Sequence, residues 1–243
     1  MIAPKLDIAA RFSTRVQAER YRDRFMNGKR RRTHAREHGA LQLLLRGLDP
    51  LASVLDVGSG PGRFTDLFAE FSDLYVQMDL SRHMLEISRD HHPLLREGQR
   101  LDPNVTFVSR RASPEFVQEF VQADAREPPF ISGCFDLVFC HRLLNHIPDR
   151  TDRGRILRRL TQVSRRYVVV SSLATPAPLW ALRRTFDTIR GRTRGHAWVS
   201  AAGLIVDGRS SGLTLESRAR FRAFPIAEWL VFTRCAETQG ALS

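Results

Sequence analysis

The chain has 243 residues, 42% of them hydrophobic, which is enough for one sizeable core arranged as one large domain or two small ones. It contains no run of 18 apolar residues, and its N-terminus has no apolar segment followed by a small-residue cleavage site. These features argue against a transmembrane helix and a signal peptide, so we expect a cytoplasmic protein. Cys134, Cys140 and Cys235 are too scattered for a disulfide framework and form no C-x-x-C pair, so no metal site is expected.

The basic residues are almost all arginines, and they are concentrated near the N-terminus. The formal net charge is +12, and residues 1–50 hold twelve basic residues against five acidic ones. Such an excess suggests an acidic partner: nucleic acid, an anionic surface such as the inner face of a membrane, or an anionic substrate. A solvated arginine face is an equally good interpretation, because the interleaved aromatic residues of a single-strand nucleic-acid platform are missing.

In chain order, two arginine-rich helical patterns come first, and we expect residues 1–50 to form a basic helical cap on a core at 51–243. Apolar runs and amphipathic stretches then alternate in the manner of β-α-β units. The predicted strands are 53–57, 73–80, 120–125, 135–140 and 166–172, with a helix at 62–71. This alternation predicts an α/β protein with a parallel, doubly wound sheet.

Three further stretches are distinctive. Residues 92–117 form a longer, less regular insertion. A tandem repeat of Glu-Phe-Val-Gln follows over 115–122, and because the third strand can begin in either copy, its predicted start is uncertain by about four residues. Residues 177–195 form a basic amphipathic helix that could cover an apolar acceptor or lie on an anionic membrane, although packing of its aromatic residues in the core is the commoner outcome. Residues 213–223 and 228–235 are strands with a short connection, which favours an antiparallel hairpin.

A glycine-rich turn follows the first strand in the stretch SVLDVGSGPGRF, residues 53–64. The absence of a Cβ at Gly58, Gly60 and Gly62 lets a ligand lie against the backbone, and the following helix supplies free N–H groups. The spacing is G-x-G-x-G with Asp56 two residues earlier, which differs from the dinucleotide fingerprint and from a Walker loop. This motif resembles the first motif of the class I S-adenosylmethionine-dependent methyltransferases.

Other landmarks follow in the order of that family, over roughly residues 50–235. Asp79 ends the second strand in MDLSRHML, where the family places an acid that accepts hydrogen bonds from both ribose hydroxyls. Asp124, with Ala125, would lie near the adenine amino group. The resemblance implies a single-domain, Rossmann-like, mostly parallel seven-stranded sheet with an antiparallel C-terminal hairpin, and S-adenosylmethionine as cofactor. The cofactor-binding positions that it implies are Asp56, Gly58, Ser59, Gly60, Gly62, Asp79, Leu80, Met84, Asp124, Ala125 and Cys140.

The N-terminal helix of many relatives lies over the cofactor. By that analogy Arg32 or Arg36 would pair with the methionine carboxylate, for which a guanidinium fork is well suited, and we choose Arg36 as the candidate. An ordinary solvated role is the commoner one for such arginines.

Methyl transfer requires an acceptor held in line with the methyl group and, for a hydroxyl acceptor, a base; it requires no metal. His141 and His146 follow the fourth strand, and an imidazole can accept such a proton near neutral pH. A hydrogen bond to backbone is an equally common role for either histidine. We favour His141 as the base, because His146 is more similar to a residue that the family carries for local packing.

The sequence thus predicts a methyltransferase that acts on an oxygen of a small or lipid-linked acceptor. An RNA methyltransferase is an alternative supported by the basic N-terminus, but EPPF at 127–130 follows the third strand, whereas the amine-methylation motif that it resembles follows the fourth. A protein that binds S-adenosylmethionine without turnover is a further alternative. A NAD-binding protein is disfavoured by the glycine spacing and the antiparallel ending.

Overall fold

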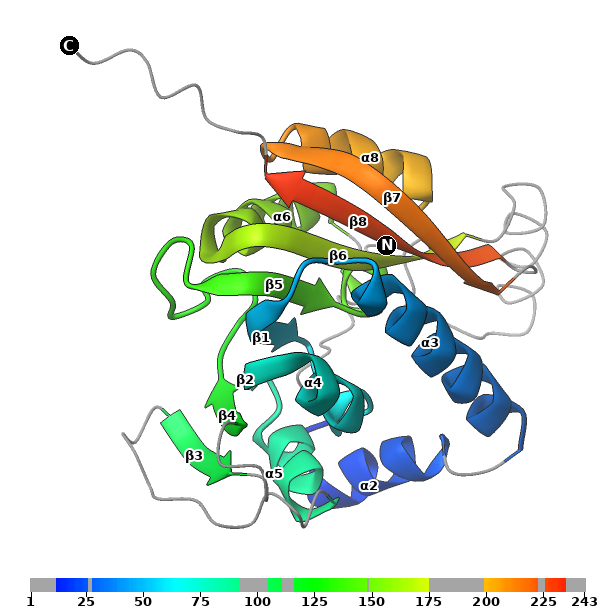
Figure 1. The fold of residues 1–243 in the computed structure, drawn as a ribbon. Helices are drawn as coiled ribbons and strands as arrows, with labels where there is room; N and C mark the ends of the chain where they lie inside the picture. Colours follow the sequence, from blue (N-terminus) through cyan, green and yellow to red (C-terminus); the bar gives the residue numbers. More distant parts are fainter. Residues whose placement is uncertain are drawn as a thin grey trace, which may run out of the picture.

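The computed structural model describes residues 12–25, 28–91, 105–110, 116–147, 149–174, 199–222 and 226–234. Within these residues the chain forms one mixed β-sheet flanked by helices (Figure 1). The amphipathic segment expected at 177–195 lies outside them. None of the helices in the described ranges is both long and apolar enough to cross a bilayer.

The sheet has the strand order β3-β4-β2-β1-β5-β6-β8-β7. Its strands are β1 (Leu51–Val57), β2 (Ser72–Asp79), β3 (Val105–Arg110), β4 (Val117–Gln122), β5 (Phe135–Cys140), β6 (Ser164–Ala174), β7 (Leu213–Arg222) and β8 (Ile226–Arg234). The five strands from β4 to β6 in this order are parallel. β3 pairs antiparallel with β4 at one edge, and at the other edge β8 pairs antiparallel with both β6 and β7.

The predicted Rossmann-like sheet with an antiparallel C-terminal hairpin is therefore confirmed, with one correction to its strand count. The described sheet has eight strands rather than seven. The additional strand, β3, lies inside the stretch 92–117 that the sequence pattern left irregular, and it pairs antiparallel with β4 at the sheet edge. β4 begins at Val117, three residues before the predicted start and within the range that the tandem repeat allowed.

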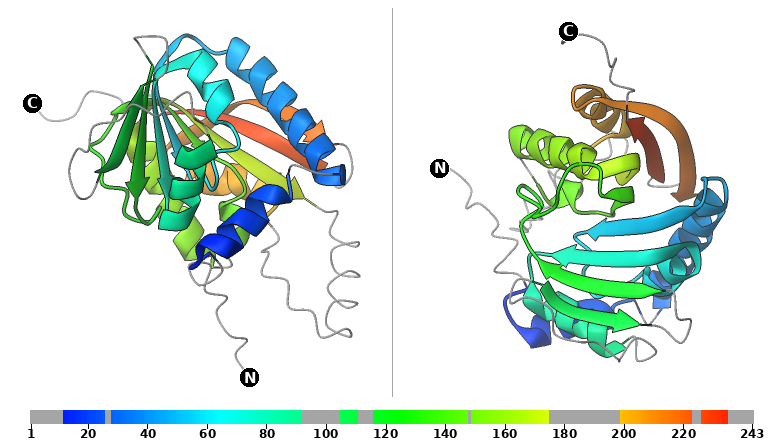
Figure 2. Two further views of the ribbon diagram at one scale, coloured as in Figure 1. Left: turned by 90° about the horizontal axis from the view of Figure 1, so that it is seen from below. Right: turned by 60° about the vertical axis from the view of Figure 1, so that its left-hand side comes forward.

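The helices are α2 (Arg15–Asp23), α3 (Gly28–Arg46), α4 (Thr65–Phe71), α5 (Arg82–His91), α6 (Arg150–Val163) and α8 (Ala201–Arg209), with a 3-10 turn η2 (Leu144–His146). α3 and α4 lie on one side of the sheet, and α6 and α8 lie on the other (Figure 2). Alternate residues of β5 enter the two apolar layers: Phe139 packs with the α4 side and Val138 with the α6 side. Such burial of both faces explains the apolar run over residues 137–140 of this strand.

A chain of buried hydrogen bonds fixes α4 and α5 against β2. Ser88 Oγ donates to Gln77 Oε1 at 2.8 Å, and Gln77 Nε2 donates to Thr65 Oγ1 at 2.9 Å. Buried polar groups are costly unless they are paired, so these bonds specify where the two helices lie. They also hold the start of α4, and with it the turn that follows β1.

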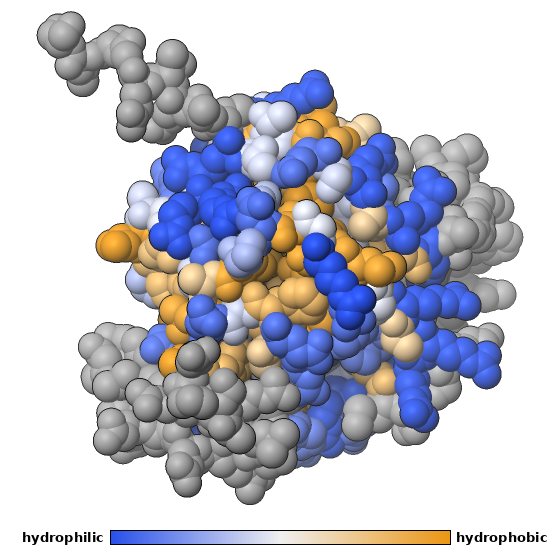
Figure 3. Space-filling model, viewed as in Figure 1, coloured by the Kyte–Doolittle hydropathy of each residue, from blue (hydrophilic) through white to orange (hydrophobic). Residues whose placement is uncertain are grey.

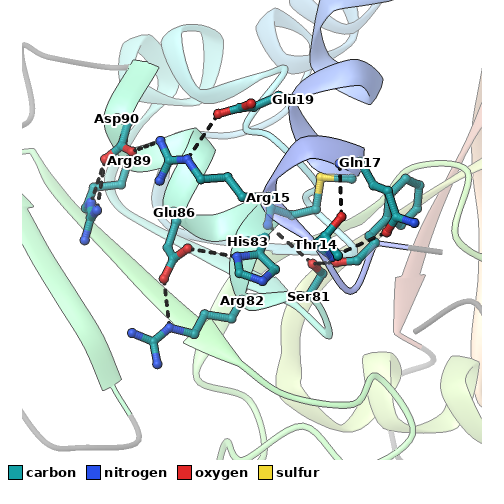
Figure 4. A network of polar contacts seen from close by, with 12 residues as sticks. Thr14, Arg15, Gln17, Glu19, Ser81, Arg82, His83, Glu86, Arg89 and Asp90 are labelled. Atoms are coloured by element: carbon teal, nitrogen blue, oxygen red, sulfur yellow. Dashed lines mark hydrogen bonds and ion pairs between the residues drawn. The ribbon is translucent and has the colours of Figure 1, made fainter. Parts of the chain in front are cut away.

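α2 lies across α5 (Figure 4). Arg15 Nη2 donates to Asp90 Oδ2 at 2.7 Å, and Ser81 Oγ donates to the carbonyl of Phe12 at 2.8 Å. Below these bonds, Ala18 of α2 is buried in a small apolar cluster with residues of α5. α2 is thereby held near the carboxyl ends of β1 and β2.

Candidate functional site

A pocket opens at the carboxyl ends of β1 and β5, the two neighbouring strands at which the order of the parallel sheet reverses. In open α/β sheets, ligands bind at such a switch point. The pocket encloses about 320 Å³ of empty space, part of it open to solvent. Its lining comes from α2, from the end of β1 and from the turns after the two strands: Tyr21, Asp56, Gly58, Ser59, Gly60, Pro61, Arg63, Phe64, His141 and Arg142.

Two glycines of the turn after β1 serve different purposes. Gly60 has a φ of +58° and Gly62 a φ of +72°, both in the left-handed region that favours glycine. A Cβ on Gly62 would lie 1.9 Å from Ser88 Oγ, so this residue lets the turn pack against α5. A Cβ on Gly60 would meet no atom within 4 Å, so this residue leaves bare backbone beside the pocket.

Asp79, at the end of β2, is tied to the glycine turn. Its Oδ2 accepts a hydrogen bond from the N–H of Gly60 at 2.9 Å, and its Oδ1 accepts one from the N–H of Ser81 at 2.8 Å. Burial raises the pKa of Asp79 above its usual value, although these backbone donors oppose the rise. Each carboxylate oxygen has a second lone pair, so Asp79 can accept further hydrogen bonds from a ligand.

Asp56 is the buried acid of the pocket, with only 2% of its surface exposed. Its Oδ2 accepts a hydrogen bond from the hydroxyl of Tyr75 at 2.8 Å. Burial raises the pKa of Asp56 to about 7, and the charge of Asp79 adds to the rise, while Tyr75 and Arg63 oppose it. Asp56 therefore changes its charge near neutral pH.

A buried ion network joins α3 to the two turns of the pocket. The carboxylate of Glu37, which is fully buried on α3, pairs with the guanidinium groups of Arg63 and Arg142. Burial alone would raise the pKa of Glu37, but His141, Arg142 and Arg63 outweigh it and hold that pKa well below its usual range. Nδ1 of His34, also on α3, lies 3.1 Å from Arg63 Nη2.

His141 lies beside this network in an aromatic environment. Its ring centroid is 4.6 Å from that of Trp229 and 5.3 Å from that of Phe64. Neither ring nitrogen has a hydrogen-bond partner among the described residues, and Nε2 is 3.7 Å from Glu37 Oε1. Burial lowers the pKa of His141 to about 3, although Glu37 opposes the shift, so the imidazole is neutral at physiological pH.

The structure brings some of the predicted site residues together and separates others. Asp56, Gly58, Ser59, Gly60 and His141 line the pocket, and Asp79 contacts it through Gly60. Gly62 packs on α5, Met84 is buried beneath α2, and Cys140 is buried in the core at the end of β5, where burial raises the pKa of its thiol.

Other predicted residues lie outside the lining of this pocket. Asp124 is occupied by a fork of hydrogen bonds from Arg126, and its neighbour Ala125 packs on the core. Leu80 is 44% exposed. His146 lies in η2, and Arg36 is exposed on α3.

Sequence reasoning missed the pocket residues Tyr21, Pro61, Arg63, Phe64 and Arg142, together with the buried Glu37. One signal was available for Glu37, which is the single acid in the arginine-rich segment 28–46. A lone acid there is a candidate partner for buried arginines. For Arg142 the signal is structural: its φ of 61° is uncommon for a residue other than glycine and typical of functional sites.

Comparison with known proteins supports a methyltransferase assignment. The family model described as "Methyltransferase domain" matches residues 55–168. A ubiquinone biosynthesis O-methyltransferase from Xanthomonas axonopodis is 28% identical over 126 residues, which are 51% of this chain and 45% of that protein. A ubiquinone/menaquinone biosynthesis C-methyltransferase from Ectopseudomonas mendocina is 30% identical over 147 residues, 59% of this chain and 50% of that protein. The chain spans about half the length of these curated relatives.

Solved structures share the fold over nearly the whole chain. Magnesium protoporphyrin IX methyltransferase from Synechocystis, with bound S-adenosylhomocysteine, superposes with a TM-score of 0.71 at 15% identity and covers 93% of this chain and 98% of that one. An S-adenosylmethionine-dependent methyltransferase from Methanosarcina mazei has a TM-score of 0.62 at 14% identity and covers 80% and 98% of the two chains. Residues 55–168 therefore match a methyltransferase domain, and the chain has the fold of methyltransferases of known structure that use S-adenosylmethionine.

Proposed function

We propose that this chain transfers a methyl group from S-adenosylmethionine to an oxygen atom of a small or lipid-linked acceptor. The observation that carries the proposal is the pocket at the sheet's switch point, which combines the bare backbone of Gly60 with the carboxylates of Asp56 and Asp79 and the neutral imidazole of His141. The two curated relatives, an O-methyltransferase and a C-methyltransferase of quinone biosynthesis, support an acceptor of the quinone-precursor class.

The residues present fit the cofactor. The open space at Gly60 lets a ligand approach the backbone, and the buried hydroxyl of Ser59 has no hydrogen-bond partner among the described residues. Asp79 lies at the next strand end with free lone pairs for a diol such as the ribose. When bound, S-adenosylmethionine supplies a methyl group already activated by its sulfonium.

His141 is our candidate base for the acceptor hydroxyl. The neutral ring is the form that accepts a proton, but a pKa of about 3 makes it a weak base, so this role requires the pKa of His141 to rise when cofactor and acceptor bind. The Glu37 carboxylate, 3.7 Å from Nε2, would stabilise the imidazolium that results. The surrounding aromatic rings of Phe64 and Trp229 exclude water from the imidazole.

The direct test is transfer of labelled methyl from S-adenosylmethionine to phenolic acceptors by the purified chain. We expect His141→Gln to lower kcat by about 10²- to 10⁴-fold, the usual contribution of a general base. Its dissociation constant for S-adenosylhomocysteine should stay within about twofold, since no charge is removed at neutral pH. His146→Gln is the competing variant: if it loses activity while His141→Gln keeps it, the base is His146. Tight cofactor binding without transfer to any acceptor would instead support a non-catalytic binding protein.

The ionisation of Asp56 gives a second test. S-adenosylmethionine carries a net positive charge, so it favours the ionised carboxylate in the pocket. Because the pKa of Asp56 is about 7, we expect the affinity for S-adenosylmethionine to rise about three- to tenfold from pH 6 to pH 8. Calorimetric titrations at both pH values measure this, and Asp56→Asn should remove the dependence. An affinity that falls over this range in the wild type would contradict the prediction.

The raised pKa of Asp56 also makes the stability of the fold depend on pH, in the direction opposite to that of the affinity. In the unfolded chain Asp56 loses its proton near its ordinary pKa of 3.8, whereas in the folded chain it keeps the proton up to about pH 7. The folded state thus binds more protons in this window. The contribution of Asp56 to the free energy of unfolding therefore falls as pH rises from about 4 to 7.

The α3 surface supports an anionic partner in addition to the acceptor. Four arginines in the first half of this helix are exposed and have no acidic partner within the part of the chain that the structure describes: Arg30, Arg31, Arg32 and Arg36. Hydrophilic side chains gather on this flank (Figure 3). We propose that this arginine-rich flank of α3 contacts an anionic membrane surface, which would supply a lipid-linked acceptor. The second candidate partner is RNA. A strongly salt-dependent affinity for RNA, without affinity for anionic vesicles, would favour RNA.

A further inference from the structure

The network of Arg63, Arg142 and Glu37 carries a net positive charge, which faces the pocket beside the acids Asp56 and Asp79. Arg63 and Arg142 share the single carboxylate of Glu37. The histidines next to them do not change this balance, because burial lowers the pKa of His34 to about 4 and that of His141 to about 3. The side chain of Arg63 is 8% exposed and that of Arg142 is 23% exposed, and both line the pocket.

Both guanidinium groups also have unused hydrogen-bond donors. Glu37 pairs with one terminal nitrogen of each group, and the Nε of Arg63 and the Nε of Arg142 are buried without a hydrogen-bond partner among the described residues. A guanidinium has five N–H donors, and leaving those of a buried charge unpaired is costly. An anion in the pocket would satisfy them.

The backbone at Arg142 adds a further sign of a functional position. Its left-handed conformation, with a φ of 61°, is held by a hydrogen bond from its own N–H to Ser171 Oγ at 2.8 Å. Such conformations are costly and persist where the surrounding structure fixes them. The constraint places this arginine at the carboxyl end of β5, opposite Arg63 in the turn after β1.

The topology indicates which end of an elongated ligand would meet these arginines. β2, β1 and β5 are adjacent in the sheet, with Asp79 at the end of β2 and Arg142 after the end of β5. The glycine turn lies between them. A ligand whose diol faces Asp79 would therefore extend across Gly60 and present its opposite end to the two arginines.

We propose that Arg63 and Arg142 form a clamp for the amino-acid carboxylate of S-adenosylmethionine, with Glu37 as the internal counter-ion that holds the two guanidinium groups side by side. The inference rests on the proposed function, because it needs that cofactor in the pocket. Guanidinium forks match a carboxylate in geometry and charge. The clamp takes the role that the sequence suggested for Arg36, which is exposed on α3 and is not among the residues that line the pocket.

Calorimetry with S-adenosylmethionine and its decarboxylated form tests the clamp, because the two compounds share the adenosine, the sulfonium and the amine. We expect the wild type to bind the carboxylate-containing compound about 10- to 100-fold more tightly, the value of one or two hydrogen bonds between charged groups. Arg142→Gln should reduce this ratio to about twofold, mainly by weakening the binding of S-adenosylmethionine. Arg142→Lys keeps the charge without the fork, so it should lose only part of the discrimination and also serves if Arg142→Gln does not fold.

Arg158→Gln, which removes an exposed arginine of α6, is the matched control and should keep the wild-type ratio. If the wild type binds both compounds equally tightly, the clamp is disproved while the proposed cofactor stands. Discrimination that survives in both Arg142 variants, or that is lost in Arg36→Gln, also overturns the clamp. Absence of binding by either compound to the wild type overturns the proposed function and the clamp together.

Discussion

We expect Glu37→Gln to lower the free energy of unfolding by about 3–5 kcal/mol at neutral pH, the usual cost of breaking a buried ion pair by removing one partner. The substitution keeps the size of the side chain but leaves Arg63 and Arg142 facing each other without a counter-ion. Because the pKa of Glu37 is held well below its usual range, its contribution is fully present above its ordinary value of 4.5 and is lost as pH falls below it.

Urea denaturation of the two proteins at pH 7 measures this difference. The matched control is Glu19→Gln, which removes an exposed carboxylate that pairs with Arg15 one turn away on α2. Exposed pairs of this kind contribute little, so the control should lose less than about 1 kcal/mol. A loss for Glu37→Gln as small as that of the control would show that the network does not stabilise the fold.

The second large effect is expected at the glycine turn. Gly62→Ala introduces a Cβ 1.9 Å from Ser88 Oγ at a φ of +72°, so backbone strain and overpacking act together. We expect it to lower the free energy of unfolding by about 2–5 kcal/mol, the sum of about 1–2 for the left-handed conformation and about 1–3 for the overpacking.

Gly60→Ala separates the two causes. Its φ is also positive, but its Cβ would enter open space, so only the strain of about 1–2 kcal/mol is expected. The new methyl group would lie in the pocket beside the backbone. We therefore expect the binding free energy for S-adenosylhomocysteine to weaken by more than the free energy of unfolding falls. Denaturation and calorimetry on both variants check this pair. Equal stability losses for the two variants would contradict the packing role of Gly62.

Local patterns were sufficient to predict most of the sheet. β5 was predicted at its observed bounds, because a short apolar run between turn signals is characteristic of a strand buried on both faces. The C-terminal hairpin was predicted from its two strand patterns and their short connection. β3 was missed, because an edge strand needs only one neighbour and its sequence lies within a long irregular stretch.

The site was predicted less completely, because much of it depends on contacts between distant parts of the chain. Arg36 and Glu37 are neighbours in sequence, but one residue turns the helix by about 100°, so one is exposed and the other is buried. The burial of Glu37 depends on partners 26 and 105 residues away. No local pattern specifies such pairing, whereas the glycine spacing and Asp79 could be read from the sequence itself.

Calorimetric titration of the purified chain with S-adenosylmethionine, with Asp79→Ala alongside, tests the proposed cofactor site most directly. We expect micromolar binding to the wild type and an affinity at least about 100-fold lower in Asp79→Ala, since two hydrogen bonds to a charged carboxylate are removed. A wild type that binds neither S-adenosylmethionine nor S-adenosylhomocysteine would show that this pocket is not a cofactor site.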